Sequence, residues 1–186
     1  MKNKIPSQQK TITDKDLNQR ALDLHKQLRG KLNVESKMIP ESIDDLALLY
    51  SPGVGAASLA IANDPAQARD LTGVNNSVAI ISDGSAVLGL GNIGPLASLP
   101  VMEGKALLFK EFGAIDGYPV VVDSKDPADF VKTVKSISAS FGGINLEDIA
   151  APECFEIEEA LKEQLSIPVM HDDQHGTAVV VLAGLI

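Results

Sequence analysis

The sequence predicts an α/β fold: three α/β/α layers built around a mostly parallel sheet. Four short apolar segments, at 77–82, 119–123, 143–149 and 167–170, have the composition of strands that are buried on both faces. Segments of helical length separate them, and such alternation is typical of a parallel sheet covered by helices. At 186 residues the chain can bury one good core, so a single domain is expected over residues 1–186.

The chain ahead of the first strand is expected to begin with a helix. Thr13, with Asp16 three residues later, has the pattern of a helix start, and Gly30 is a suitable C-terminal stop. A short extended stretch is expected at 32–38.

Two further helical segments follow before the first strand. Ser42 is the expected N-cap of a short helix, which must end before the sequence Tyr50-Ser51-Pro52-Gly53 because the residue preceding a proline disfavours helical backbone. Helices rich in small residues then cover 55–71, with Asp64-Pro65 as a fresh start.

The remaining helices alternate with the four predicted strands. They are expected at 100–112, 127–141, 153–165 and from about 174 to the end. No internal repeat, low-complexity tract or linker interrupts this order.

Composition and charge exclude several classes of protein. The chain is 45% hydrophobic and 22% charged, which is typical of a globular protein and excludes disorder or a coiled coil. Its net charge of −9 disfavours nucleic acid and anionic membranes as partners, since both are polyanions. An anionic substrate would therefore need local cations for its capture.

Cys154 is the only cysteine, so no disulfide can form within the chain and a reducing compartment, the cytoplasm, is expected. The residue itself is expected to be a small buried hydrophobe. The basic start at residues 1–6 is not followed by the apolar segment of a signal peptide, and no apolar run is expected to span a membrane.

Two acidic clusters, at 145–148 and 171–176, stand where predicted strands end. Neighbouring carboxylates such as Glu147 and Asp148 can converge only where the chain turns out of the strand, because strand side chains alternate between faces. Converging carboxylates repel one another unless a divalent cation neutralises them, and oxygen ligands suit Mg²⁺ or Mn²⁺ over zinc. The alternative is that these acids are solvated groups at strand ends and helix N-termini.

The sequence Gly89-Leu90-Gly91-Asn92-Ile93-Gly94 matches the G-x-G-x-x-G dinucleotide fingerprint. That fingerprint requires a strand directly before it and an acidic residue about 20 positions later, at the end of the next strand. Asp123 lies too far along. We therefore expect these glycines to allow tight turning near a site, and no nucleotide-binding residue is assigned in this chain.

His171 and His175 are four residues apart, a spacing that invites a zinc site on one helical face. Residues 168–170 indicate a strand instead, so His171 is expected at its end. We favour the carboxylates as ligands and the histidines as structural or supporting groups.

Lys105 and Tyr50 are the remaining candidates for chemistry. Lys105 has mostly apolar neighbours, and partial burial would lower its pKa toward use as a general base. The alternative is a helix lysine whose charged end reaches solvent. Tyr50 precedes the glycine-containing loop 51–55 and is equally compatible with a packing role.

Five ordered motifs together resemble the N-terminal domain of bacterial malic enzymes, whose fold is similar to that of amino-acid dehydrogenases. They are LYSPGV at 49–54, SDGSAVLGLGNIGP at 82–95, LPVMEGK at 99–105, NLEDI at 145–149 and HDDQHGTA at 171–178. The resemblance covers nearly all of the chain after about Leu22. It implies oxidative decarboxylation of L-malate to pyruvate with NAD or NADP and with Mg²⁺ or Mn²⁺; oxaloacetate is the intermediate. Malolactic enzymes and soluble oxaloacetate decarboxylases are similar and remain alternatives.

The resemblance also implies residue roles. Tyr50 would be the general acid, and Lys105 would be the general base and contact the substrate. Asp172 would lie beside the metal site and tune Lys105 or the metal's surroundings. The implied metal ligands are Glu147, Asp148 and Asp173.

Two departures from the family pattern stand out. Larger animal-type enzymes have an arginine where this chain has Ala86. The chain also stops inside the apolar helix that leads, in the family, to the NAD(P)-binding domain, so that domain is expected to be absent and residues 1–186 would be the catalytic half. A homodimer is expected, and an inactive fragment that serves as a binding or dimerisation module is the non-enzyme alternative.

Overall fold

The computed structural model describes residues 14–186, so the expected helix start at Thr13 lies outside the described residues. The chain divides into two units, Met1–Lys31 and Leu32–Ile186. In the first unit, helix α1 covers Asp14–Leu28. Arg29 and Gly30 follow it with φ of 55° and 102°, the left-handed backbone that ends helices, which confirms the predicted stop at Gly30.

The second unit begins with an irregular stretch and two helices. Residues 32–38 contain no strand. Helix α2 (Ile43–Leu49) has the predicted N-cap: the Ser42 hydroxyl accepts a hydrogen bond from the Asp45 N–H, and the Asp45 carboxylate accepts one from the Ser42 N–H, each at 3.0 Å. Helix α3 covers Val54–Asn63, and α4 covers Ala68–Leu71 after a 3₁₀ turn at Pro65–Gln67.

The expectation that no apolar run could span a membrane needs a correction. By length and composition alone, the segment Ile43–Asn63 is long and apolar enough, with a mean hydropathy of 1.3. The chain folds it as two short helices, α2 and α3, because the turn at 51–53 separates them. A membrane span needs a continuous helix that satisfies its own backbone hydrogen bonds.

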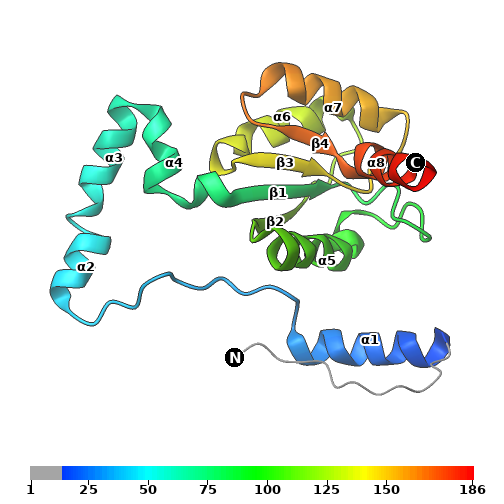
Figure 1. Cartoon of the computed structure of the whole chain (residues 1–186), viewed down its shortest axis with the longest axis horizontal. Helices are drawn as coiled ribbons and strands as arrows, with labels where there is room; N and C mark the ends of the chain where they lie inside the picture. The colour runs from blue at the N-terminus through cyan, green and yellow to red at the C-terminus, as the bar shows by residue number, and fades with distance from the viewer. Residues whose placement is uncertain (1–13) are drawn as a thin grey trace. The chain divides into compact units, whose positions relative to one another are not determined.

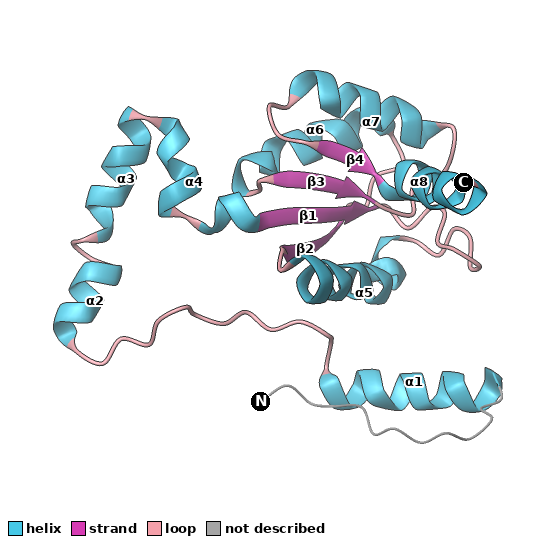
Figure 2. Ribbon diagram, viewed as in Figure 1, coloured by secondary structure: helices cyan, strands magenta, loops and turns pink. Residues whose placement is uncertain are grey.

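Four strands form one parallel sheet in the order β2-β1-β3-β4 (Figure 2). Their bounds are β1 Ser77–Ser82, β2 Asp116–Val121, β3 Gly143–Leu146 and β4 Val169–His171. All three pairings are parallel, so the carboxyl ends of the strands meet at one edge. This confirms the predicted parallel sheet.

Helices cover both faces of the sheet, as Figure 1 shows. On one face, α5 (Pro95–Gly113) packs Met102 and Ala106 against Ile80. On the other face, α6 (Pro127–Ile137) and α7 (Glu153–Gln164) pack against Ala79 and Ile81. Alternate residues of β1 thus face opposite layers, which confirms the predicted α/β/α arrangement.

Several element boundaries differ from the expected ones. Helix α5 begins at Pro95, five residues earlier than expected, so Pro100 lies inside the helix at the cost of one backbone hydrogen bond. Strand β2 runs from Asp116 and includes Pro119, which is tolerated because β2 is an edge strand. The last helix, α8, covers Asp172–Leu185 and begins directly after β4. A 3₁₀ turn at Ser138–Ser140 extends α6.

Candidate metal centre and catalytic site

The three predicted metal ligands meet at the carboxyl edge of the sheet. Glu147 and Asp148 directly follow β3, and Asp173 lies in the first turn of α8, directly after β4. One ligand oxygen from each of these residues lies within 4.8 Å of the others. Since β3 and β4 are parallel neighbours, their carboxyl ends deliver the three groups to one place.

The backbone at Asp148 lets two consecutive residues serve the same centre. Asp148 has φ of 56°, the left-handed conformation that aspartate tolerates better than most residues. Its N–H donates a 2.8 Å hydrogen bond to Asp173 Oδ2, and its carbonyl accepts from Ala86 N–H at 3.0 Å. The chain therefore turns out of the strand at Asp148, as the sequence argument required.

Lys105 reaches this cluster from the helix layer that α5 forms on one face of the sheet. It lies on α5, and its Nζ is 2.9 Å from Glu147 Oε1 and 2.6 Å from Asp172 Oδ2. Glu147 Oε2 accepts a further hydrogen bond from the Asn145 side-chain amide at 2.9 Å. The structure thus brings Lys105, Asp172 and the three predicted ligands together.

Burial changes the acidity of the clustered carboxyl groups. It is the largest cause that raises the pKa of Glu147, despite opposing hydrogen bonds from Lys105 and Asn145. Burial also raises the pKa of Asp148, with repulsion from Asp173 adding to it. Both acids therefore ionise less readily than ordinary carboxyl groups, in spite of the nearby Lys105 ammonium, and a bound metal cation would oppose the effect of burial.

The direction expected for the Lys105 pKa was wrong. Burial does lower it, but the hydrogen bonds to Asp172 and Glu147 outweigh burial, and the net pKa is raised. The sequence showed apolar neighbours along the helix and not the two carboxylates that the fold places against the amine. The alternative of a lysine reaching solvent is also excluded, because its side chain is only 22% exposed.

The donor set fits a hard divalent cation. Asp148 Oδ2 is buried and has no hydrogen-bond partner among the described residues. A buried charged oxygen without a partner is costly, and a cation bound by Glu147, Asp148 and Asp173 would satisfy it. All three groups offer oxygen, the donor that Mg²⁺ and Mn²⁺ prefer.

Ser85 supports this centre and was missed by the sequence analysis. Its hydroxyl donates to Asp83 Oδ1 at 2.6 Å and accepts from the Ala150 N–H at 2.8 Å. The loop after β1 is thereby tied to the loop that carries Glu147 and Asp148. A serine in a glycine-rich loop gives no sequence signal for such a role, because its partner lies 65 residues away.

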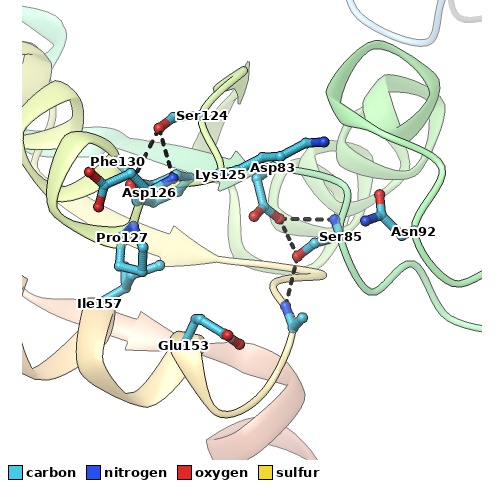
Figure 3. Close-up of a pocket in the computed structure, with 11 residues that line it drawn as sticks. Asp83, Ser85, Asn92, Ser124, Lys125, Asp126, Pro127, Phe130, Glu153 and Ile157 are labelled. Carbon is cyan, nitrogen blue, oxygen red and sulfur yellow. Dashed lines mark hydrogen bonds between the residues drawn. The ribbon is translucent and has the colours of Figure 1, made fainter.

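A pocket of about 220 Å³ adjoins this junction (Figure 3). Figure 3 shows Asp83 and Ser85 on one wall, with Asp126 and Glu153 across from them. The residues that line it are Asp83, Ser85, Asn92, Ser124, Lys125, Asp126, Pro127, Phe130, Ala150, Glu153 and Ile157. The clustered carboxylates and Lys105 are not among them.

The glycine-rich segment 89–94 does not have the setting of a dinucleotide fingerprint. Strand β1 ends at Ser82, and an isolated antiparallel bridge between Val87 and Gly91 separates it from α5. Gly84 has φ of +67°, and a Cβ there would lie 2.2 Å from the Gly94 carbonyl oxygen. Gly89, Gly91 and Gly94 have φ of 76°, 74° and 80°, the left-handed backbone that allows the expected tight turning.

The two histidines lie on different elements, which excludes the zinc site on one helical face. His171 ends β4 and is fully buried, whereas His175 lies on α8 and its Nε2 is 2.9 Å from Glu158 Oε2. Burial lowers the pKa of His171, so its ring is neutral near pH 7. Cys154 is buried in the core between the sheet and α7, as predicted.

Tyr50 is the one candidate that the structure does not bring to the cluster. It is the C-cap residue of α2 and is 74% exposed. In Figure 1, α2 and α3 lie beyond the amino-terminal end of β1, whereas the carboxylates lie at the carboxyl end of the sheet.

Known proteins match this chain in sequence and in structure. The family model for the malic enzyme N-terminal domain matches residues 29–129 and 124–162. An NAD-dependent malic enzyme of Geobacillus stearothermophilus is 59% identical over 157 residues, which are 84% of this chain and 33% of that protein. A bifunctional malic/malolactic enzyme of Bacillus subtilis is 54% identical, over 91% of this chain and 42% of its own length.

Two solved structures agree with these relatives. The NAD-dependent malic enzyme of Thermotoga maritima superposes with a TM-score of 0.87 at 51% identity, over 89% of this chain and 46% of that one. The Entamoeba histolytica malic enzyme gives a TM-score of 0.88 at 40% identity, over 91% of this chain and 36% of that one. The chain spans between about a fifth and two fifths of the length of the curated relatives it matches. It belongs to the malic enzyme family and corresponds to that family's N-terminal domain.

Proposed function

We propose that this chain is the catalytic and metal-binding half of a malic enzyme, which oxidises L-malate and decarboxylates the product to pyruvate and CO₂. The observation that carries the proposal is the convergence of Lys105 with Glu147, Asp148 and Asp173 at the carboxyl edge of the sheet. A base and a divalent-cation site within contact distance suit the chemistry of a 2-hydroxy acid.

Each residue has a role in that proposal. Glu147, Asp148 and Asp173 would hold Mg²⁺ or Mn²⁺, which supplies Lewis-acid polarisation of the substrate's oxygens when bound. Lys105 would take the proton of the C2 hydroxyl as hydride leaves C2, which requires that its raised pKa fall once Glu147 serves the metal instead of pairing with Nζ. Asp172, at 2.6 Å from Nζ, would pair with the resulting ammonium. Tyr50 would return a proton to C3 after CO₂ departs.

The parts needed for hydride transfer are proposed to lie outside these residues. Relatives are named as NAD-dependent or NADP-dependent malic enzymes, and the chain spans less than half of each. Residues 1–186 would form one catalytic domain, and a further domain would bind the nicotinamide cofactor. A homodimer is proposed as the assembled state.

A second candidate is malolactic or oxaloacetate decarboxylase activity. It is favoured by the B. subtilis relative, which is named a bifunctional malic/malolactic enzyme. Decarboxylation of oxaloacetate needs the metal, Lys105 and Tyr50 but no net redox change. The same residues would therefore serve either reaction.

The test is metal-dependent loss of oxaloacetate in the presence of the chain, compared with free Mn²⁺ in buffer. Tyr50→Phe and Lys105→Ala are each expected to lower the rate by roughly a hundredfold or more, the range that general acid–base groups supply. Lys132→Ala, at an exposed lysine on α6, is the matched control and should leave the rate unchanged.

Activity on malate with NAD or NADP, measured beside oxaloacetate, separates the two candidates. Equal rates for the parent, both variants and free Mn²⁺ would show that this half is inert by itself, and would favour a binding or dimerisation module instead.

A further inference from the structure

We propose that Gly176 is a positioning residue: the lack of a side chain there leaves the space in which the Asp172 carboxylate pairs with Lys105. This inference rests on the roles proposed for Lys105 and Asp172. It adds to the proposed reaction a residue that has no side chain of its own to contribute.

The first support is the position of Gly176 on α8. It follows Asp172 by four residues, and residues four apart lie on the same face of a helix. A helical Cβ leans toward the amino terminus of its helix, so a side chain at 176 would lie over the turn that carries Asp172. A Cβ built at Gly176 would be 2.2 Å from Asp172 Oδ1 and 3.0 Å from its Cγ.

The second support is that Asp172 has little freedom to move aside. Its Oδ2 lies 2.6 Å from Lys105 Nζ, while Oδ1 of the same carboxylate borders Gly176. Because the carboxylate is rigid and planar, a rotation that moves Oδ1 away from an added Cβ also moves Oδ2. Glu147 Oε1 also pairs with Nζ, at 2.9 Å, so a shift of the amine toward a displaced Asp172 would lengthen that contact. A methyl group at 176 would therefore weaken the pairing of Asp172 with Lys105.

The third support is that glycine is an unfavourable choice for this helix. Glycine has one of the lowest helix propensities, since it loses the most backbone freedom on folding. Helix α8 runs from Asp172 to Leu185, and Gly176 is not among the described glycines with positive φ. The backbone conformation therefore does not require glycine at 176, whereas the space beside Asp172 does.

Gly184 provides a matched control on the same helix. It lies near the end of α8 and is exposed, and a Cβ there would meet nothing within 4 Å. Gly184→Ala therefore favours the helix without touching Asp172.

Urea unfolding in two backgrounds tests the placement without using activity. Alanine favours the helix, so Gly176→Ala should raise the midpoint of an Asp172→Ala chain by roughly 0.3 to 1 M urea. In the parent, overlap with the Asp172 carboxylate opposes that gain, and the midpoint should stay the same or fall. Gly184→Ala should have the same effect in both backgrounds. Equal gains for Gly176→Ala in both backgrounds would overturn the inference.

Oxaloacetate decarboxylation with Mn²⁺ tests the function of the same space. Gly176→Ala should lower the parent rate by about tenfold to a hundredfold, because displacing a positioned group by about 1 Å has a cost of that order. In the Asp172→Ala chain, the same substitution should change the rate by less than about twofold, since no carboxylate remains to be displaced. Gly184→Ala should retain the parent rate.

The outcomes of the two experiments are distinct. A parent-like rate in Gly176→Ala, or equal losses with and without Asp172, would overturn the inference. A parent that is inactive on oxaloacetate counts against the proposed function, while the unfolding midpoints still decide whether Gly176 makes room for Asp172.

From separate contacts we infer that Glu158 is a positioning residue for the proposed metal ligand Asp173. Glu158 lies on α7 and is only 5% exposed. Its Oε1 accepts a hydrogen bond from the His171 backbone N–H at 3.1 Å, and its Oε2 is 2.9 Å from His175 Nε2. His171 is the N-cap of α8, and its own side chain makes no capping hydrogen bond. One carboxylate thus holds the chain two residues before and two residues after Asp173.

Glu158 remains ionised in spite of its burial. Burial raises its pKa, but Lys162, His175 and the His171 N–H lower it by more, and the net pKa is lowered. Lys162 Nζ lies 2.7 Å from Oε1, within α7 itself. The lysine therefore contributes charge to Glu158 but no link to α8, which makes it a matched control.

Mn²⁺ affinity, measured by calorimetric titration, tests this role. Glu158→Leu, which has a similar size but neither acceptor atom, should weaken binding roughly tenfold to a hundredfold, the usual effect of losing a group that orients a ligand. Glu158→Gln retains one acceptor and should recover part of the affinity. Lys162→Met should stay within about twofold of the parent. Parent-like affinity in Glu158→Leu, or equal losses in Glu158→Leu and Lys162→Met, would overturn this inference.

Amide hydrogen exchange of residues 171–176 in the metal-free chain provides a readout that does not depend on the metal. Exchange should be about tenfold or more faster in Glu158→Leu, because a buried charge-assisted hydrogen bond is lost, and unchanged in Lys162→Met. Unchanged exchange in Glu158→Leu would show that Glu158 does not hold α8. A parent that binds no Mn²⁺ counts against the proposed metal centre, and the exchange rates then still decide the role of Glu158.

Discussion

At the scale of single residues, the site depends on carboxylates held where they are reluctant to ionise. Burial raises the pKa of both Glu147 and Asp148. Asp173 is more exposed, with 39% of its side chain accessible, and its Oδ2 already accepts from Asp148 N–H. Protonation of the two buried acids therefore competes with metal binding. Asp173 is the third ligand of the cluster.

We expect Asp173→Ala to weaken Mn²⁺ binding by more than about tenfold, since one anionic ligand and one loop contact are lost together. Calorimetric titration measures this, with Asp70→Ala as the control because Asp70 is an exposed acid on α4, which precedes β1. Parent-like affinity in a Glu147, Asp148 and Asp173 triple alanine variant would contradict the ligand assignment.

The raised pKa values predict how metal binding depends on pH. A carboxyl group with a raised pKa takes up its proton at a higher pH than an ordinary acid, so protons compete with Mn²⁺ earlier as the pH falls. Affinity should therefore decline already above the pH range in which unperturbed Asp and Glu titrate, about 3.9 to 4.3. Titrations between pH 7 and pH 5 check this, and a flat profile over that range would contradict it.

At the scale of elements, the connection from β1 to α5 has the tightest backbone requirement. A Cβ at Gly84 would meet the Gly94 carbonyl at 2.2 Å, and φ of +67° adds strain. Gly89 has φ of +76° but open space around its Cβ position. A comparison of alanine substitutions at the two glycines thus separates the effect of steric overlap from the effect of backbone strain.

Gly84→Ala should lower the free energy of unfolding by about 2 kcal/mol or more, and Gly89→Ala by about 1 kcal/mol, because only the first adds overlap to strain. Denaturant unfolding of both variants measures the difference. Equal losses would contradict the argument that the two segments touch at Gly84.

The elements that sequence predicts well are those with local signals. The Ser42 cap and the buried strand at 77–82 have such signals, and the structure agrees with both. Strand β2 is displaced toward Asp116 because its extent follows pairing with β1, which the local pattern does not contain. Motif resemblance located Lys105 and the carboxylates, but no local signal distinguishes Glu158 from its solvent-exposed neighbours, since its partners come from another element.

At the scale of the whole molecule, the exposed apolar side chains of α2 and α3 predict the proposed homodimer. Leu48 is 74% exposed on α2, and its burial against a second copy would stabilise the dimer. Leu48→Asp should shift sedimentation from dimer to monomer, because a charge would be buried at the contact. Val34→Asp, at a 98% exposed position outside α2 and α3, is the control. A parent that sediments as a monomer would contradict this prediction.

At the same scale, we predict that residues 1–186 do not bind nicotinamide cofactors appreciably. The glycine-rich loop is not directly preceded by a strand, and no acidic partner stands at the distance that the fingerprint requires. Calorimetric titration of residues 1–186 with NAD and with NADP should show no appreciable binding. A micromolar dissociation constant for either would contradict the assignment of that role to another domain.

The left-handed backbone at Asp148 has a consequence for anyone who wishes to redesign this centre. Asparagine and glycine are the other residues that adopt φ near 56° readily, so the choices at this position are few. Asp148→Asn keeps the bend and removes only the charge, whereas Asp148→Ala alters both. A metal-free scaffold with an unchanged loop, suited to accept a different ligand set, is therefore best begun from asparagine.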